Sequence, residues 1–241
     1  MAFTTVFKRY ELKYMLTDGQ KARLFQLMSR YMEADRYPKS TIRNVYFDTY
    51  SYRLIRRSIE HPPYKEKLRL RSYERARPDS AVFVELKKKY DHVVYKRRLF
   101  MTEDMATEWI SRGAPIPCNT QIGREIEYFK SFYGGLLPRV FLSYDREAFV
   151  ACDGSDLRIT LDTNILARTN ELSLACDPGG EELLEDGLTL MEIKTSGAIP
   201  LWLCRFLSRE GIYETSFSKY GTAYKKLIFN TSEANNYGKP V

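Results

Sequence analysis

The alternation that decides the fold begins in EKLRLRSY (residues 66–73) and continues in SAVFVELKK (80–88) and VVYKRRLFM (93–101). In each segment apolar residues alternate with charged ones, which is the two-residue period of a β-strand whose two faces differ chemically. The breaks between the segments, RARPD and KYD, are short enough for hairpins. We therefore predict three consecutive antiparallel strands.

The flanking sequence adds further strands and helices. We expect about eight strands, which are the three above and residues 6–15, 41–48, 139–150, 157–166 and 188–195. Helices are expected at residues 18–32, 51–58, 105–111, 121–133, 200–209 and 219–229, with Thr17 as the N-cap of the first and an acidic loop at 177–186. Strands and helices do not alternate regularly, so the predicted fold class is α+β, an antiparallel eight-stranded β-barrel that forms a tunnel, with helices packed outside. We expect one domain over 1–241, with a core at about 5–229 and a tail at 230–241.

Charged side chains share one face in strand after strand. Residues at i, i+2 spacing form seven rows, which are Glu11/Lys13, Arg69/Arg71, Glu85/Lys87, Lys96/Arg98, Tyr144/Arg146, Arg158/Thr160/Asp162 and Glu192/Lys194. The alternate positions are mostly apolar, as in Leu68 and Leu70. A solvent-exposed face would explain any single strand, but seven concordant strands predict a lumen that holds the charges. Cations facing inward repel one another unless a polyanion and water fill the space, and Arg and Lys suit phosphate groups.

Composition excludes several classes of protein. Lys and Arg number 38 against 31 Asp and Glu, and this net charge of +7 permits a phosphate-rich partner without identifying one. Four scattered cysteines and two histidines make a structural zinc site or a His-based triad improbable. No run approaches 18 apolar residues and the N-terminus has no signal-like apolar region, so we expect a cytoplasmic protein or a domain that faces the cytoplasm. Strand aromatics alternate away from the cationic face, which argues against nucleic-acid binding.

The carboxylates on the cationic face need their own explanation, because Glu11, Glu85 and Glu192 would weaken anion binding. An ion pair with a neighbouring cation is the commoner role for a glutamate in such a position. A second role is to ligate Mg²⁺ or Mn²⁺ together with substrate phosphates and water. We favour Glu192 as the ligand.

Nine segments together resemble one known family. They are KRYELKY (8–14), NVYFDT (44–49), KLRLRSY (67–73), VFVELKKK (82–89), VYKRR (94–98), SYDREAF (143–149), LRITLDTNI (157–165), MEIKTSG (191–197) and FSKYGTAY (217–224). The chain resembles the VTC domain, the catalytic module of vacuolar transporter chaperone polyphosphate polymerases, in the CYTH or triphosphate tunnel metalloenzyme superfamily. The resemblance implies an ATP-dependent polymerase that transfers a γ-phosphoryl group to a growing polyphosphate chain. It also leaves room for a membrane-protein partner in a larger complex.

The resemblance implies roles for particular residues. Matched by motif, the tunnel residues that bind phosphate are Lys13, Arg69, Arg71, Lys87, Lys96, Arg146 and Arg158, with Tyr144 near the nucleotide, Ser218 and Lys219 as a late phosphate-contacting pair, and Glu192 on Mg²⁺ or Mn²⁺. Strand alternation places Glu11, Glu85, Arg98 and Lys194 on the same substrate-facing side. We expect Lys13, Arg69, Arg71, Lys87, Arg146 and Lys219 to act directly on the transferred group.

One departure from the superfamily bears on the reaction. Hydrolytic members begin with an ExExK strand, whereas this chain has Arg9 at the first Glu position, followed by Glu11 and Lys13. Loss of that carboxylate argues against a triphosphatase with two tightly held metals. Two alternatives stay open, a triphosphatase acting on an organic or inorganic triphosphate and a non-catalytic polyphosphate-binding module.

Overall fold

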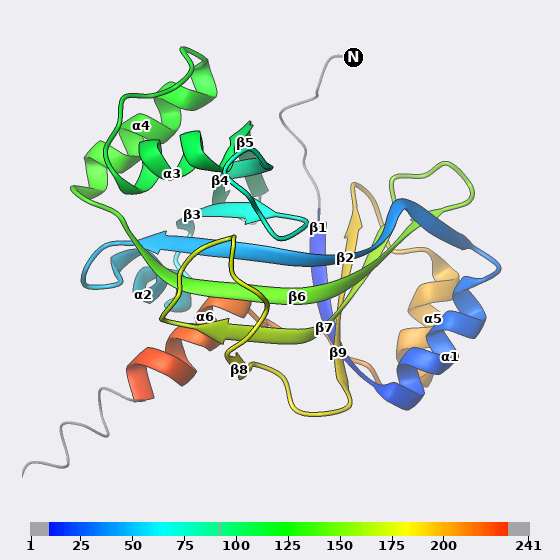
Figure 1. The fold of residues 1–241 in the computed structure, drawn as a ribbon. Coiled ribbons are helices and arrows are strands. Elements are labelled where there is room, and N and C mark those ends of the chain that lie inside the picture. Colours follow the sequence, from blue (N-terminus) through cyan, green and yellow to red (C-terminus); the bar gives the residue numbers. More distant parts are fainter. Residues whose placement is uncertain (1–9, 92, 231–241) are drawn as a thin grey trace, which may run out of the picture.

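The computed structural model describes residues 10–91 and 93–230, and its main element is one antiparallel sheet (Figure 1). Eight strands follow one another in the order β1-β9-β7-β6-β2-β3-β4-β5, and the two-residue strand β8 (Glu181–Glu182) pairs with β7. The eight are β1 (Tyr10–Thr17), β2 (Met32–Asp48), β3 (Tyr64–Ser72), β4 (Ala81–Tyr90), β5 (Val93–Thr102), β6 (Leu137–Ala151), β7 (Arg158–Arg168) and β9 (Leu188–Thr195). The prediction of an antiparallel eight-stranded tunnel fold is confirmed.

The sheet curls until its two ends approach each other. Lys87 of β4 donates from Nζ to Glu11 Oε2 of β1 at 3.1 Å, so a side-chain contact connects the first strand of the path to the last but one. Within the described residues no backbone pairing joins β5 to β1. The wall of the tunnel is therefore continuous in backbone hydrogen bonds through eight strands, and side chains of β1 and β4 approach each other across the open side.

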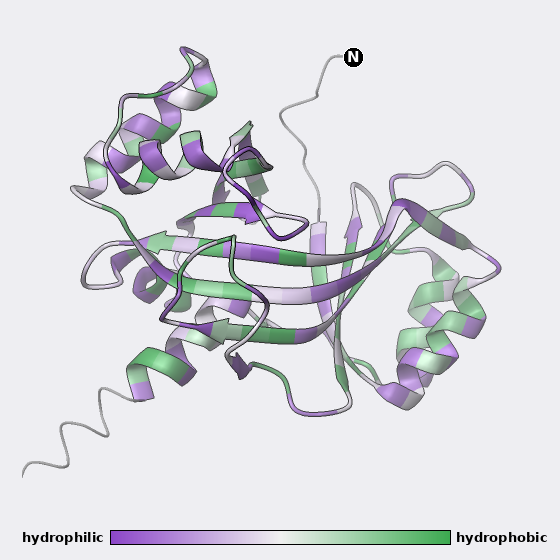
Figure 2. Cartoon of the chain, viewed as in Figure 1, coloured by the Kyte–Doolittle hydropathy of each residue, from purple (hydrophilic) through white to green (hydrophobic). Residues whose placement is uncertain are grey.

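Two pairs of helices cover the outer face of the sheet (Figure 1). Helices α1 (Asp18–Met28) and α5 (Leu201–Arg209) pack through Leu24 and Phe206 on β1, β7 and β9. Helices α3 (Glu103–Ser111) and α4 (Gln121–Tyr133) pack through Trp109 and Ile126 on β3, β4 and β5. Hydrophobic and hydrophilic residues alternate along the strands (Figure 2), and the apolar set meets these helices, as we predicted.

A third pair of helices packs on the tunnel side of the sheet. The tyrosine rings of Tyr46 in β2 and Tyr220 in α6 (Lys219–Tyr224) stack with centroids 4.6 Å apart. Asp48 at the end of β2 accepts hydrogen bonds from the backbone of Leu54 in α2 (Arg53–Ile59) and from the Tyr220 hydroxyl. A π-helical turn, Lys225–Phe229, continues α6. These contacts fix the start of α6 against the tunnel, where Lys219 enters it.

Two boundaries differ from the prediction by more than two residues, and the short strand β8 lies inside the loop predicted at 177–186. The first helix ends at Met28, and β2 begins at Met32 rather than at residue 41. The segment ADRYPK has no apolar alternation, and its strand geometry comes from pairing with β6 across an irregularity between Ala34 and Lys39. The predicted cap is confirmed, because Thr17 and Gln20 form a capping box. The predicted start of the first strand at residues 6–9, Arg9 and the tail from residue 231 lie outside the described residues.

None of the helices in the described part of the chain is both long and apolar enough to cross a lipid bilayer.

Candidate active site

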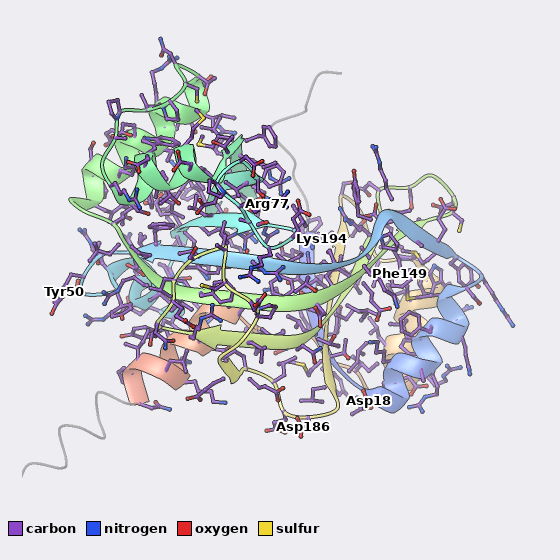
Figure 3. The ribbon with its side chains drawn as sticks, viewed as in Figure 1. Asp18, Tyr50, Arg77, Phe149, Asp186 and Lys194 are labelled. Atoms are coloured by element: carbon purple, nitrogen blue, oxygen red, sulfur yellow. The ribbon has the colours of Figure 1, made fainter. Side chains whose placement is uncertain are left out.

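The concave side of the sheet encloses a cavity of about 1490 Å³ that is lined mainly by charged side chains. Every residue predicted for the site lines this cavity except Glu85, which lies behind its wall with 1% of its surface exposed. Figure 3 shows side chains crowding the space that the sheet encloses, with Lys194 among them, whereas Asp18, Tyr50 and Asp186 lie at the periphery. Sequence alternation thus predicted one shared face correctly.

Glu192 lies at the centre of the first of two charged clusters. Its Oε1 accepts from Lys219 Nζ at 3.0 Å, and its Oε2 accepts from Lys194 Nζ at 2.9 Å and from Arg146 Nη2 at 3.2 Å. Fully buried Asp162 holds the same cluster from below, through two 2.6 Å bonds from Arg146 and an ion pair of 2.6 Å with Lys219. Burial would raise the pKa of Glu192, but Lys194, Lys219 and Arg146 together hold that pKa well below its usual range.

Glu85 is the counter-ion of the second cluster. Its carboxylate lies 2.8 Å from Arg69, 2.7 Å from Lys96, 2.5 Å from Arg98 and 3.8 Å from Arg71. Burial opposes ionisation, but the four cations hold the pKa of Glu85 well below its usual value. Glu85 therefore gathers four cations of the cavity wall, and both of its carboxylate oxygens are engaged in ion pairs with them.

The remaining predicted residues occupy the cavity between and beside these clusters. Tyr144 accepts from Arg71 Nη2 at 3.1 Å. Ser218 caps α6 and accepts from Lys67 Nζ at 3.1 Å. Glu11 lies 3.8 Å from Lys13, and the ammonium of Lys87 lowers its pKa most strongly. Arg158 is the least integrated, because it is half-exposed and its guanidinium pairs with Asp35 at 2.6 Å, away from both clusters.

The sequence analysis missed three lysines of this site, since Lys65, Lys67 and Lys89 line the cavity. Asp162, which was predicted to share the charged face, lies beneath the cavity. Lys65 and Lys67 alternate in phase with Arg69 and Arg71 on β3, and Lys89 alternates in phase with Glu85 and Lys87 on β4, so strand alternation could have found all three.

The donor atoms near Glu192 fit a divalent metal that is shared with substrate phosphates. Thr160 lies directly opposite Glu192 in the β7–β9 pairing, and its hydroxyl is buried without a hydrogen-bond partner among the described residues. Within the same ranges no three His, Cys, Asp or Glu side chains come close enough to hold an ion by themselves. One carboxylate, one free hydroxyl and substrate oxygens match the way Mg²⁺ is usually bound.

Lys67 allows a prediction about stability and pH. Burial, with the nearby ammonium groups of Lys13 and Lys87, lowers the pKa of Lys67 to about 7, far below an unfolded-state value of roughly 10.4. Between these two pKa values the unfolded chain binds more protons than the folded chain, so stability rises with pH across this window. We expect Lys67→Met to raise the melting temperature at pH 6 by a few degrees, since ~1 kcal/mol corresponds to about 2–4 °C at this size.

Melting temperatures of wild type and variant between pH 6 and pH 9.5 check this expectation. The gain should shrink as pH rises, because wild-type Lys67 loses its proton. Lys88→Met is the matched control, since Lys88 is next to Lys87 in the sequence but does not line the cavity. A gain that stays constant with pH would contradict the assigned cause.

Comparisons with known proteins agree with this geometry. A family model described as the VTC domain matches residues 8–228. A structure from Bacillus halodurans, provisionally named an adenylate cyclase, is 14% identical and has a TM-score of 0.54, with 89% of this chain and 96% of that chain covered. A Hippeastrum protein, provisionally named an adenylyl cyclase and described as having a dominant triphosphatase activity, is 16% identical with a TM-score of 0.55, with 91% and 97% covered. At these identities the two structures establish the fold. A search of curated proteins returned no match.

Proposed function

The chain belongs to the VTC domain family, and from this premise we propose that it is an ATP-dependent polyphosphate polymerase. In this proposal the γ-phosphoryl group of ATP is transferred to the end of a polyphosphate chain inside the charged cavity. The proposal includes a divalent metal, Mg²⁺ or Mn²⁺, a cytoplasmic location and no nucleic-acid substrate. Export of the product would require a membrane-protein partner.

The observation that carries the proposal is the excess of cations in an enclosed cavity. Sixteen lysines and arginines line the cavity, which are Lys13, Arg36, Lys39, Lys65, Lys67, Arg69, Arg71, Lys87, Lys89, Lys96, Arg98, Arg146, Arg158, Lys194, Lys219 and Lys225. Five carboxylates line it, which are Glu11, Asp35, Glu66, Glu192 and Glu214, and buried Glu85 and Asp162 lie behind it. Glu11, Glu85, Glu192 and Asp162 are each ion-paired with these cations. A surplus of this kind favours a ligand that carries many negative charges along its length.

The protonation states of the carboxylates favour a phosphate over water as the acceptor. Attack by water would need a positioned base, and Glu11 and Glu85 are the residues that could serve. The pKa of each is held far below its usual value by ion pairs, so each is a poor proton acceptor. A terminal phosphate of polyphosphate is already ionised near neutral pH and needs no base.

In the proposed reaction the protein positions charge around the transferred group. Arg69 and Arg71 of β3 line the cavity together with Arg146 of β6 and Lys219 of α6, and these cations would neutralise the phosphate oxygens. Glu192, with the Thr160 hydroxyl beside it, would hold a metal ion, which supplies Lewis-acid stabilisation of phosphate oxygens when it is bound. Tyr144 keeps Arg71 in place through its hydroxyl.

A product assay tests the proposal. The protein is incubated with ATP labelled at the γ-phosphate and with Mg²⁺ or Mn²⁺, and polyphosphate is separated from free phosphate. We expect label in a polymer that a polyphosphatase degrades, and none when the label is at the α-phosphate. Free phosphate without polymer would replace this function by a triphosphatase. Neither product, with polyphosphate still bound, would indicate a binding module.

A further inference from the structure

Four lysines face one another across the pairing of β3 and β4. In the register of these strands Lys65 lies opposite Lys89, and Lys67 lies opposite Lys87. All four line the cavity. Like charges directly opposite each other in a sheet are destabilising, so this block of lysines is costly to the fold unless a ligand offsets it.

The lysine block, defined as Lys65, Lys67, Lys87 and Lys89, lacks the counter-ions that the rest of the cavity has. Lys87 pairs with Glu11, but the other three form no ion pair with a carboxylate in residues 10–91 and 93–230. Glu66 lies between two of them in sequence and also borders the cavity, but its carboxylate accepts from the hydroxyls of Tyr64 and Tyr133. The cations around Glu85 and Glu192, by contrast, are gathered on buried carboxylates.

The row of cations is also longer than a triphosphate requires. Lys65, Lys67, Arg69 and Arg71 succeed one another on the tunnel face of β3, and the six residue steps from Lys65 to Arg71 span about 20 Å. A triphosphate bound by Arg69 and Arg71, within reach of Glu192, would leave the lysine end of this row without phosphate. Lys65 reaches instead toward the carbonyl of Ser58 at the end of α2, at 3.5 Å.

We propose that the three lysines of the block without a carboxylate partner, Lys65, Lys67 and Lys89, form a subsite for the phosphates of a linear polyphosphate beyond the third, continuous with the triphosphate site at Lys87, and that this subsite makes the protein prefer long chains to triphosphate. The inference rests on the proposed function for the identity of the ligand. A linear polyanion presents one charge after another along its length, which matches a ladder of ammonium groups. A short triphosphate engages the arginine clusters and leaves the ladder unpaired.

Binding measurements with purified ligands test the subsite without turnover. Dissociation constants are measured for inorganic tripolyphosphate and for long-chain polyphosphate, with wild type, Lys65→Gln, Lys89→Gln and Lys88→Gln. Lys88 is the matched control, because it is adjacent to Lys89, carries the same charge and lies opposite Glu66 on the other face of the sheet. We expect Lys65→Gln and Lys89→Gln each to weaken long-chain binding roughly tenfold and tripolyphosphate binding by no more than about twofold. The salt dependence of long-chain binding should fall by about one released counterion per variant.

Three results would overturn the subsite. Equal losses for both ligands would place the lysines in the triphosphate site, equal losses in Lys88→Gln would indicate general attraction, and no loss would leave the block without a binding role. The proposed function and the subsite can fail independently. If the protein makes no polymer from ATP but the lysine variants lose affinity for long chains only, the subsite stands and the polymerase proposal is wrong. If the protein makes polymer and the variants show no selective loss of long-chain binding, the polymerase proposal stands and the subsite is wrong.

Discussion

Substitution of Glu192 by alanine is expected to reduce polymer synthesis by roughly 10²–10³-fold, the usual effect of removing one preorganised electrostatic group from an active site. The carboxylate contacts Lys219, Lys194 and Arg146 within 3.2 Å and is 6% exposed. Without it these cations repel one another, and Thr160 loses the carboxylate that lies opposite it in the β7–β9 pairing. We also expect metal-free binding of polyphosphate to become tighter, because the cavity gains one net positive charge. Initial rates and metal-free binding constants check both effects.

The metal dependence of the remaining activity separates two roles for Glu192. In the near-isosteric variant Glu192→Gln the metal concentration for half-maximal rate should rise at least tenfold if the carboxylate holds the ion. Asp162→Asn is the comparison, since Asp162 supports Arg146 and Lys219 but lies below the cavity. We expect it to lower stability and leave the metal requirement near the wild-type value. If the metal concentration for half-maximal rate rises equally in both variants, Glu192 acts only as a counter-ion and does not hold the metal.

The alternation of apolar and charged residues predicted the fold because it can be recognised within each strand's own sequence. Each strand with one apolar and one charged face allows only one assignment of inside and outside, and Leu68, Leu86 and Ile193 all pack on the outer helices. The long strand β2 was not predictable in the same way, since ADRYPK carries no period and depends on β6, a hundred residues later. The gap in pairing between β5 and β1 depends on twist and stagger summed over eight strands, which no single segment encodes.

The site was predictable in its residue types and less so in its connections. Alternation and family resemblance together identified the cations and the three glutamates. The sequence did not indicate that Glu85 binds four cations from the two neighbouring strands β3 and β5, because those partners are set by strand order. Lys67 lies on the same face of its strand as Arg69 and Arg71, so alternation predicts its position. The family resemblance gives roles to Arg69 and Arg71 but none to Lys67. The lysine block depends on the register of β3 and β4, which places like charges opposite each other and which neither strand's sequence gives by itself.

The largest expected effect on stability is that of Glu85→Leu. Removal of one partner from a buried charge cluster typically costs about 3–5 kcal/mol, because the remaining charges stay buried without compensation. Glu85 is 1% exposed and is the shared counter-ion of Arg69, Lys96 and Arg98. At about 2–4 °C per kcal/mol, we expect the melting temperature to fall by roughly 6–20 °C. Thermal unfolding monitored by circular dichroism at low salt measures the loss.

Ligand rescue distinguishes lost charge compensation from lost packing. Tripolyphosphate can supply the missing negative charge to the same three cations, so it should raise the melting temperature of Glu85→Leu by more than that of wild type. Glu108→Gln is the control, because the pair of Glu108 with Arg112 is exposed on α3 and should contribute less than about 0.5 kcal/mol. A Glu85 variant that loses stability but gains no more from tripolyphosphate than wild type would mean that the cluster is held by packing rather than by charge. In that case the arginines would not be free to exchange Glu85 for phosphate, and the cationic wall would have to bind its ligand with its counter-ion still in place.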